Sequence, residues 1–291
     1  MGPRTDNRSL TTRCHTPPRL LFVILFLLLF ALLGLLFRLT GPGLERLLWY
    51  SAHRTASFRY RDYLPVFVVL GLGAAATALA GDAFLDLAES VQETSPRLHQ
   101  IDTEVHQWAA AARTQGATPF FTIMTLIGTP VGLGVLVTIV AVILAFRGRW
   151  RWAAYLFVTS TVGGLLNLLL KAFFARARPE LAEALRDAHG YSFPSGHAMG
   201  STIVFGALCY LAFRVIHEWR WRAVVLAFNC SMIAAIATSR IYLGVHWISD
   251  IAAGISAGLI WLIATTVAYE TFRRIRLLRS LRMKREEMST T

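Results

Sequence analysis

Seven long apolar runs constrain this chain more than any other feature of its sequence. A helix needs about 20 apolar residues to cross the hydrocarbon core of a bilayer, where every backbone polar group must be satisfied internally. Only 16% of the 291 residues are charged, against about 25% in soluble domains. The sequence therefore predicts an all-α, polytopic bundle of transmembrane helices with about seven spans. The expected spans are residues 20–39, 64–80, 127–146, 153–174, 198–216, 223–238 and 248–269.

The basic residues indicate how these spans are oriented. Lys and Arg gather on the cytoplasmic side of membrane proteins, and here they gather in 146–152, 213–222 and 273–285. We therefore expect the C-terminus in the cytoplasm and the loops 175–197 and 239–247 on the outer face. Because the net charge of +12 gathers at the ends of apolar runs, it marks membrane topology, and we expect no nucleic-acid partner.

The first apolar run does not follow this rule, because residues 1–19 and residues 39–62 carry four Arg each. The run is long for a signal peptide and no A-x-A cleavage site follows it, so we expect an uncleaved anchor of open orientation. The expected division of the chain is then a basic segment, anchor and loop (1–62), a membrane domain (63–272) and a basic cytoplasmic tail (273–291).

An amphipathic helix is predicted near residues 96–113, between the second and third runs. Ser95 and Pro96 form a common helix start, with Ser at the N-cap and Pro at the first helical position. Apolar residues then recur at helical spacing on an otherwise polar helix: Leu98, Ile101, Val105, Trp108 and Ala112. Such a helix is typical of a membrane surface. We expect His99 and His106 to be surface or packing residues.

Two groups of polar residues lie at the predicted outer ends of spans. KAFFARARP places Lys171 and Arg178 seven residues apart, on one face if the helix continues to Pro179. FPSGHA contains Ser195 and His197 and opens a helix, whose first N–H groups attract anions. Taken alone, the first group is compatible with Lys and Arg side chains that extend to the membrane–water interface. The second is compatible with an N-cap Ser and an incidental His.

A third group, SRIYLGVHWISD, falls between two of the most apolar stretches of the chain. Its His246 and Asp250 are four residues apart and are expected on one helical face, so the carboxylate can hold one imidazole nitrogen and make the other more nucleophilic. Arg240 precedes His246 by six residues, across a Leu-Gly turn that can fold it back. Taken alone, this is also compatible with a structural His–Asp pair.

Together the three groups predict a site for a multiply charged anion. Lys171, Arg178 and Arg240 are three cations on one predicted side, and Arg matches phosphate oxygens with two hydrogen bonds. Two histidines suit a two-step phosphoryl transfer, in which one attacks phosphorus and the other protonates the leaving oxygen. No cluster of Cys or carboxylates suited to Zn²⁺ or Mg²⁺ accompanies the cations, so we expect no metal and no other cofactor.

These motifs resemble the signatures of the type 2 phosphatidic acid phosphatase superfamily, K-x6-R-P, P-S-G-H and S-R-x5-H-x3-D. All three are complete here, in order, and the resemblance covers about residues 120–270. It implies a six-helix phosphatase-type core, to which this chain adds an N-terminal span. It also implies that His246 is the nucleophile and forms a phosphohistidine, that Asp250 orients it, and that His197 is the general acid. The implied phosphate-binding residues are Lys171, Arg178, Arg240, Ser195 and Gly196, with Ser239 as a weaker helper.

The resemblance thus implies an integral-membrane phosphatase that hydrolyses phosphomonoester or diphosphate lipids. Undecaprenyl diphosphate, phosphatidylglycerol phosphate and phosphatidic acid all qualify; the first is preferred if the host is a bacterium, with the site on the periplasmic face of the inner membrane. A phosphotransferase that uses a lipid diphosphate stays open, because only the acceptor differs. Vanadate-dependent haloperoxidases share the site but are soluble. A non-catalytic transporter or lipid-binding protein would need no oriented nucleophile. The sequence does not indicate an oligomeric state.

Overall fold

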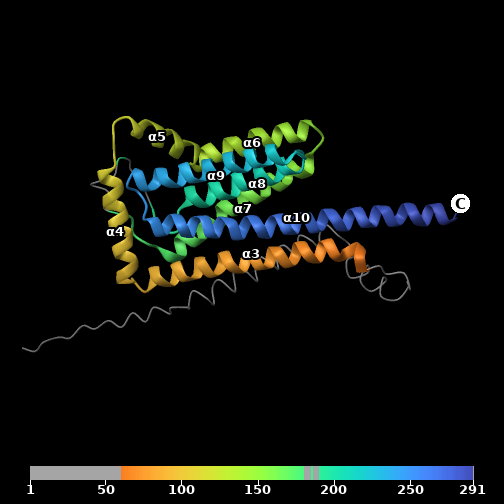
Figure 1. The fold of residues 1–291 in the computed structure, drawn as a ribbon, viewed down its shortest axis with the longest axis horizontal. Helices are drawn as coiled ribbons and strands as arrows, with labels where there is room; N and C mark the ends of the chain where they lie inside the picture. Colours follow the sequence, from red (N-terminus) through yellow and green to blue (C-terminus); the bar gives the residue numbers. More distant parts are fainter. Residues whose placement is uncertain (1–59, 180–184, 186–189, 291) are drawn as a thin grey trace, which may run out of the picture. The chain divides into compact units, whose positions relative to one another are not determined.

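Eight helices and no strands make up the part of the chain that the structure describes, residues 60–179, 185 and 190–290 of a computed structural model. The predicted all-α fold is therefore confirmed. The predicted span 20–39 and nearly all of the predicted N-terminal segment 1–62 lie outside the described residues. The helices are α3 (Tyr60–Gln92), α4 (Pro96–Ala111), α5 (Ala117–Ile127), α6 (Pro130–Phe146), α7 (Trp150–Phe174), α8 (Gly196–Phe213), α9 (Trp219–Tyr242) and α10 (Ile248–Thr290) (Figure 1).

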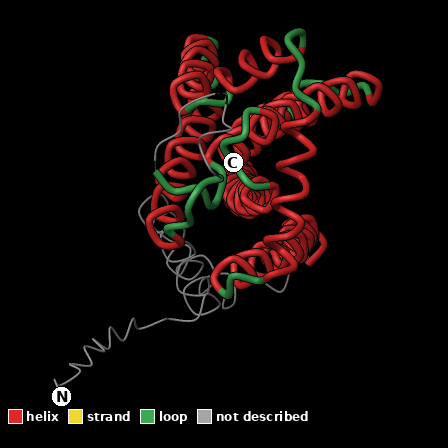
Figure 2. Tube along the Cα trace, turned by 90° about the vertical axis from the view of Figure 1, so that its left-hand side faces the viewer, coloured by secondary structure: helices red, strands yellow, loops and turns green. Residues whose placement is uncertain are grey.

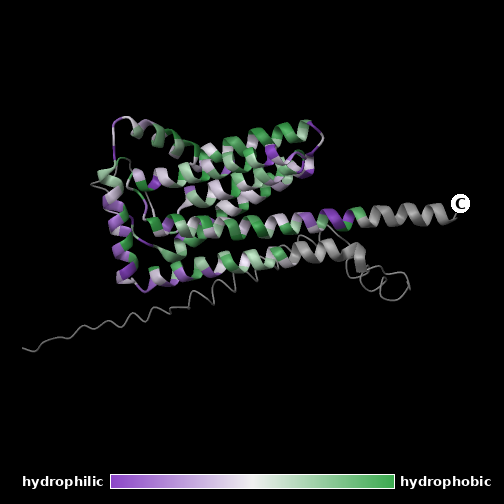
Figure 3. Ribbon diagram, viewed as in Figure 1, coloured by the Kyte–Doolittle hydropathy of each residue, from purple (hydrophilic) through white to green (hydrophobic). Residues whose placement is uncertain are grey.

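Five of the described helices are long and apolar enough to cross a membrane. They are α3 over Gly71–Gln92, the whole of α7, α8 and α9, and α10 over Ile248–Leu277. Apolar residues predominate along them, whereas α4 is mostly hydrophilic (Figure 3). The described residues thus hold five spans, or six if the bent pair α5–α6 counts as one.

The predicted span 127–146 begins too early, because a break at residues 128–129 separates Ile127 from the helix that follows. α5 and α6 meet at an angle of 59°, and α6 begins only at Pro130. Thr129 caps α6, since its Oγ1 accepts a hydrogen bond from the N–H of Gly132 at 3.0 Å. A Thr followed by Pro is a common helix start, so the sequence did contain the signal for this break. Helix α5 was not predicted.

Helices α6 to α10 run up and down, and their connections alternate between the two ends of the bundle (Figure 1). Small residues bring α10 and α8 close together. A Cβ on Gly254 would lie 2.6 Å from the carbonyl oxygen of Ser195, and one on Gly258 would lie 2.9 Å from Cβ of Thr202. These contacts leave no room for a side chain and agree with the packing role of GxxxG spacing. The main apolar core contains Leu133, Val137, Tyr155, Leu156, Val204, Phe205, Ala207, Leu211 and Ile236.

α4 lies across the end of the bundle at which α7 and α9 end and α8 and α10 begin (Figure 1). Figure 2 shows the same unit from that end, with the connecting loops toward the viewer. The helix predicted near 96–113 is thus confirmed, with Ser95 at the N-cap position and Pro96 in its first turn. The predicted apolar stripe is only partly exposed: Ile101 is 43% exposed and Trp108 is 72% exposed, whereas Leu98 and Val105 are half-buried. The buried face holds Asp102, His106 and Ala109.

Candidate active site

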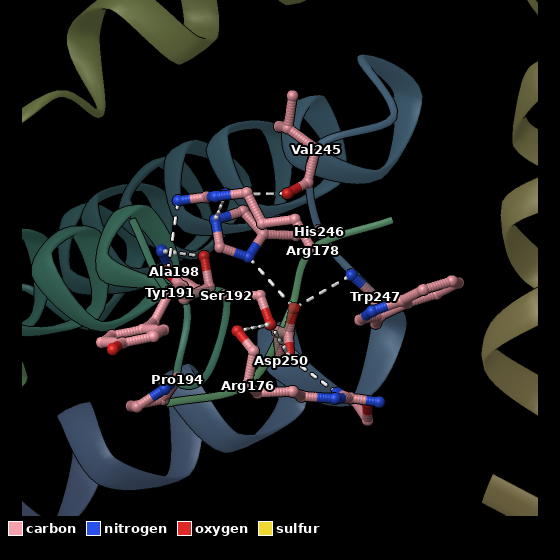
Figure 4. Close-up of polar contacts among 12 residues, drawn as sticks. Arg176, Arg178, Tyr191, Ser192, Pro194, Ala198, Val245, His246, Trp247 and Asp250 are labelled. Carbon is pink, nitrogen blue, oxygen red and sulfur yellow. Dashed lines mark hydrogen bonds and ion pairs between the residues drawn. The ribbon is translucent and has the colours of Figure 1, made fainter. Parts of the chain in front are cut away.

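The site lies at the end of the bundle that α4 crosses, where the three predicted groups meet. They come from the last turn of α7 and the segment after it, from the start of α8, and from the last turn of α9, the corner that follows and the first turn of α10. Figure 4 shows Arg178 next to the His246 ring and Arg176 on the far side of Asp250. The fold therefore brings together residues that are up to 79 positions apart in the sequence, from Lys171 to Asp250.

His246 and Asp250 form the predicted pair. Nδ1 of His246 lies 3.2 Å from Oδ2 of Asp250, and the N–H of Trp247 donates to the same oxygen at 3.1 Å. His246 lies in the turn before α10 and not on the helix itself, so the pair is joined across the helix start. Because a carboxylate only accepts hydrogen bonds, Nδ1 carries the proton and Nε2 is left with its lone pair.

The environment of His246 favours this neutral form. Only 2% of the residue is exposed. Burial lowers the pKa of its imidazole to about 4, although the hydrogen bond to Asp250 and the charge of Asp250 act in the opposite direction. An imidazole with this pKa is neutral at pH 7, as a nucleophile must be.

Arg178 contacts the free nitrogen of His246. Its Nη1 lies 3.1 Å from Nε2 of His246 and also donates to the carbonyl oxygen of Val245 at 2.8 Å. The other nitrogens donate to the carbonyl oxygens of Gly190 at 3.0 Å and Tyr191 at 3.3 Å. A phosphate drawn to this guanidinium would therefore lie against Nε2 of His246.

Lys171 reaches the site by another route than the one predicted. α7 ends at Phe174, where Ala175 takes a left-handed conformation, so Lys171 and Arg178 do not share a helical face. Both instead meet at one backbone position, because Nζ of Lys171 donates to the carbonyl oxygen of Tyr191 at 2.6 Å. The chain after α7 folds back and brings the second cation to the first.

Arg240 and His197 complete the set of charged and titratable groups. Arg240 lies in the last turn of α9, is buried, and donates through Nη1 to Oγ1 of Thr125 on α5. His197 lies in the first turn of α8, within electrostatic range of Arg240, His246 and Lys171. Its Nε2 is buried and has no hydrogen-bond partner among the described residues. A buried, unsatisfied ring nitrogen is suited to exchange a proton with a bound molecule.

The small residues of the motifs have structural contacts. Oγ of Ser195 accepts the N–H of Ala198 as an N-cap, and the N–H of Ser195 donates to the carbonyl oxygen of Asp250 at 3.0 Å. Oγ of Ser239 donates to the carbonyl oxygen of Ile236 at 2.7 Å. A Cβ on Gly196 would lie 2.8 Å from Oδ1 of Asn167, so a larger residue there would displace the Asn167 side chain. Phosphate binding by Ser195, Gly196 and Ser239 stays a prediction.

Four residues near the site were not singled out from the sequence. Thr125 accepts from Arg240, and Asn167 donates to the carbonyl oxygen of Pro194 at 3.4 Å. Arg176 forms ion pairs with Asp250 and with Asp102, each at 2.7 Å. Arg176 lies inside KAFFARARP, so its place in a predicted group was a signal for it in the sequence. The others come from parts of the chain that carry no motif, so only the fold identifies them.

Metal ligands of the usual kind do not gather in the described part of the chain: no three His, Cys, Asp or Glu there are placed to hold an ion. The polar groups that the structure brings together are Lys171, Arg178, Arg240 and the two histidines. Guanidinium and ammonium groups bind anions. The donor set therefore fits a phosphate, and metal independence stays a prediction for assay.

Several known proteins are similar to this chain in sequence and in fold. Residues 152–274 match the PAP2 superfamily. Phosphatidylglycerophosphatase B of Bacillus subtilis (strain 168) is 28% identical over 195 residues, which are 66% of this chain and 94% of that protein. Lipid A 1-phosphatase of Rhizobium etli is 34% identical over 125 residues, 40% of this chain and 50% of that protein.

A solved structure gives the same picture. The crystal structure of a transmembrane PAP2-type phosphatidylglycerolphosphate phosphatase from Bacillus subtilis aligns with a TM-score of 0.60 at 25% identity, over 65% of this chain and 94% of that chain. The matched residues 152–274 include all three motifs and the helices α7 to α10 that carry them. Residues 152–274 therefore form a domain of the PAP2 superfamily, within a bundle whose helices are long and apolar enough to span a membrane.

Proposed function

We propose that this protein is an integral-membrane lipid phosphatase that acts through a phosphohistidine. The observation that carries the proposal is the position of His246, with Nδ1 at Asp250 and Nε2 at Arg178, 3.2 and 3.1 Å away. An anion site alone needs no imidazole oriented in this way. The homology to bacterial membrane phosphatases supports the hydrolase class.

The proposed reaction has two steps. Nε2 of His246 attacks phosphorus, the bond from phosphorus to the lipid oxygen breaks, and His197 gives its proton to that oxygen. Water then attacks the phosphohistidine, His197 accepts a proton from the water, and inorganic phosphate leaves His246 free. Lys171, Arg178 and Arg240 bind the phosphate oxygens in both steps, where charge develops.

The proposed substrates are lipids whose phosphate lies at headgroup depth: phosphatidylglycerol phosphate, phosphatidic acid and undecaprenyl diphosphate. Phosphatidylglycerol phosphate is the first to test, because the relative that aligns over 66% of the chain is named for it. The proposed location is a bacterial inner membrane, with the site on the periplasmic face and the C-terminus in the cytoplasm. Within this scheme, 63–272 is the phosphatase domain, 1–62 the anchor segment and 273–291 the tail.

The test is release of inorganic phosphate from each of the three lipids by purified protein in detergent micelles. We expect hydrolysis of at least one lipid, undiminished in excess chelator, and none with His246→Ala. Phosphate that appears only when a hydroxyl acceptor is added, and then on that acceptor, would identify a phosphotransferase. If chelator abolished activity and Mg²⁺ restored it, the proposed mechanism would be wrong.

A further inference from the structure

Both oxygens of the Asp250 carboxylate are held. Oδ2 accepts from Nδ1 of His246 and from the N–H of Trp247. Oδ1 accepts from Nη1 of Arg176 at 2.7 Å, and the side chain of Asp250 is fully buried. Figure 4 shows this arrangement, in which Arg176 binds the edge of the carboxylate away from the His246 ring. Arg176 therefore fixes which oxygen is presented to the imidazole.

Arg176 in turn is held by a second carboxylate, which α4 supplies. Its Nη2 donates to Oδ2 of Asp102 at 2.7 Å, and Asp102 is also fully buried. Asp102 further accepts from the backbone N–H of Ser249 at 3.0 Å and from its Oγ at 2.7 Å. Ser249 lies in the first turn of α10, next to Asp250. The carboxylate from α4 thus binds the start of the helix that carries Asp250.

Loss of any one of Asp102, Arg176 and Asp250 would leave a charge of the other two without its partner. Two buried carboxylates, Asp102 and Asp250, share a single guanidinium, and a buried charge without a partner is costly. Glu104, two residues along the same helix, is exposed and pairs with its neighbour Gln100 at 2.7 Å. Simple docking of a surface helix needs no fully buried acid, so the position of Asp102 calls for a specific role.

Given the proposed function, we propose that Asp102 and Arg176 are positioning residues for phosphoryl transfer. They hold the Asp250 carboxylate, and through it Nδ1–H of His246, so that Nε2 keeps its direction of attack. In the first step the imidazole gains positive charge as it bonds to phosphorus, and a fixed Asp250 stabilises that charge. The position of α4 on the bundle therefore affects the rate of the chemical step, whereas phosphate binding depends on Lys171, Arg178 and Arg240.

The test compares Asp102→Asn with Glu104→Gln, the same change at the exposed position of the same helix. Outer partners of active-site groups typically contribute about 10–100-fold. We expect kcat of Asp102→Asn to fall within that range, with the rate of phosphoenzyme formation falling in parallel. KM should stay within about twofold, because Lys171, Arg178 and Arg240 are untouched. Glu104→Gln should match the wild type.

A double-mutant cycle tests whether the two residues act as one unit. Arg176→Gln alone should slow the chemical step, and the double variant with Asp102→Asn should be no slower than the slower single variant. If Asp102→Asn does not fold, Ser249→Ala removes one donor to Asp102 and one acceptor for Nη1 of Arg176, while the ion pairs of Arg176 stay in place. It should lower kcat by about 10-fold or more, the value of a hydrogen bond to a charged group, at unchanged KM.

Three results would overturn the inference while leaving the proposed function intact. The first is a wild-type kcat in Asp102→Asn, or in Ser249→Ala where that variant is used. The others are an effect on KM alone and strictly additive effects in the double-mutant cycle. A wild-type protein that hydrolysed none of the lipid phosphates would instead overturn the proposed function, and the inference with it. The thermal unfolding temperature of each variant in detergent shows whether a loss of activity comes from a loss of folded protein.

Discussion

At the scale of single residues, the contact between Arg178 and His246 is the most informative in the structure. An arginine next to a protonated histidine would be repelled, so their 3.1 Å separation requires a neutral ring with its lone pair toward the guanidinium. Asp250 holds the opposite nitrogen and fixes that tautomer. Arg178 and Asp250 thus give His246 the state and the direction that the proposed attack on phosphorus requires.

The low pKa of His246 can be measured directly. Burial disfavours the charged ring more than Asp250 favours it, so the pKa should lie near 4 and not near the ordinary value of about 6.5. Above that pKa the ring is neutral and competent; below it the ring is protonated and cannot attack. Nitrogen-15 shifts of labelled histidines should show that the His246 ring, assigned by the loss of its signal in His246→Gln, stays neutral down to pH 5. A His246 signal that titrates near pH 6.5 would refute the prediction.

The two histidines should differ in what their loss abolishes. His246→Ala should remove both turnover and the covalent intermediate. His197→Ala should slow turnover by about 10²–10⁴-fold, the usual contribution of a general acid, yet still form phosphoenzyme from a substrate with a good leaving group. Rapid quench with ³²P-labelled substrate and peptide mapping of the acid-labile label provide the measurement. Label on any residue other than His246 would exclude the assigned nucleophile.

At the scale of elements, the ends of helices place the catalytic groups more than the helices themselves do. α7 ends at Phe174 with a left-handed Ala175, and this early end lets Arg178 fold back toward His246. Similarly, the bend after α5 leaves Gly128 so close to α8 that a Cβ would lie 3.0 Å from the His197 ring. Short, irregular segments therefore carry the geometry, and the long helices hold those segments in place.

Helix α5 should matter for phosphate binding through Thr125. This residue is fully buried and accepts a hydrogen bond from Arg240. Thr125→Val keeps the shape but removes the acceptor, and a hydrogen bond to a charged group contributes about 1.5–3 kcal/mol. We expect kcat/KM to fall about 10- to 100-fold, mainly through a higher KM. Thr138→Val is the control, because Thr138 is exposed on α6 and bonds only to its own helix in the described contacts. Equal kinetics for the two variants would rule out this role for α5.

At the scale of the whole molecule, the sequence predicted the helical bundle and the three groups that form the site, since apolar length and motif spacing are local properties. It could not predict which remote residues would complete the site. Asp102 lies 148 positions from Asp250, and the two meet at Arg176 only because α4 crosses the end of the bundle. The predicted span 153–174 ends at the same residue as α7, so the condition for a shared face of Lys171 and Arg178, a helix that continues to Pro179, does not hold.

The topology of the bundle gives the last prediction. The segments 147–149 and 214–218 lie at one end, and α4 with the site lies at the other (Figure 1). The basic residues at the first end predict that it is cytoplasmic, so α4 should be accessible from outside. In a background without Cys14, Cys209 and Cys230, Gln107→Cys on the exposed face of α4 should react with an impermeant thiol reagent in intact cells. Arg147→Cys should react only after permeabilisation, and the reverse pattern would place the site in the cytoplasm.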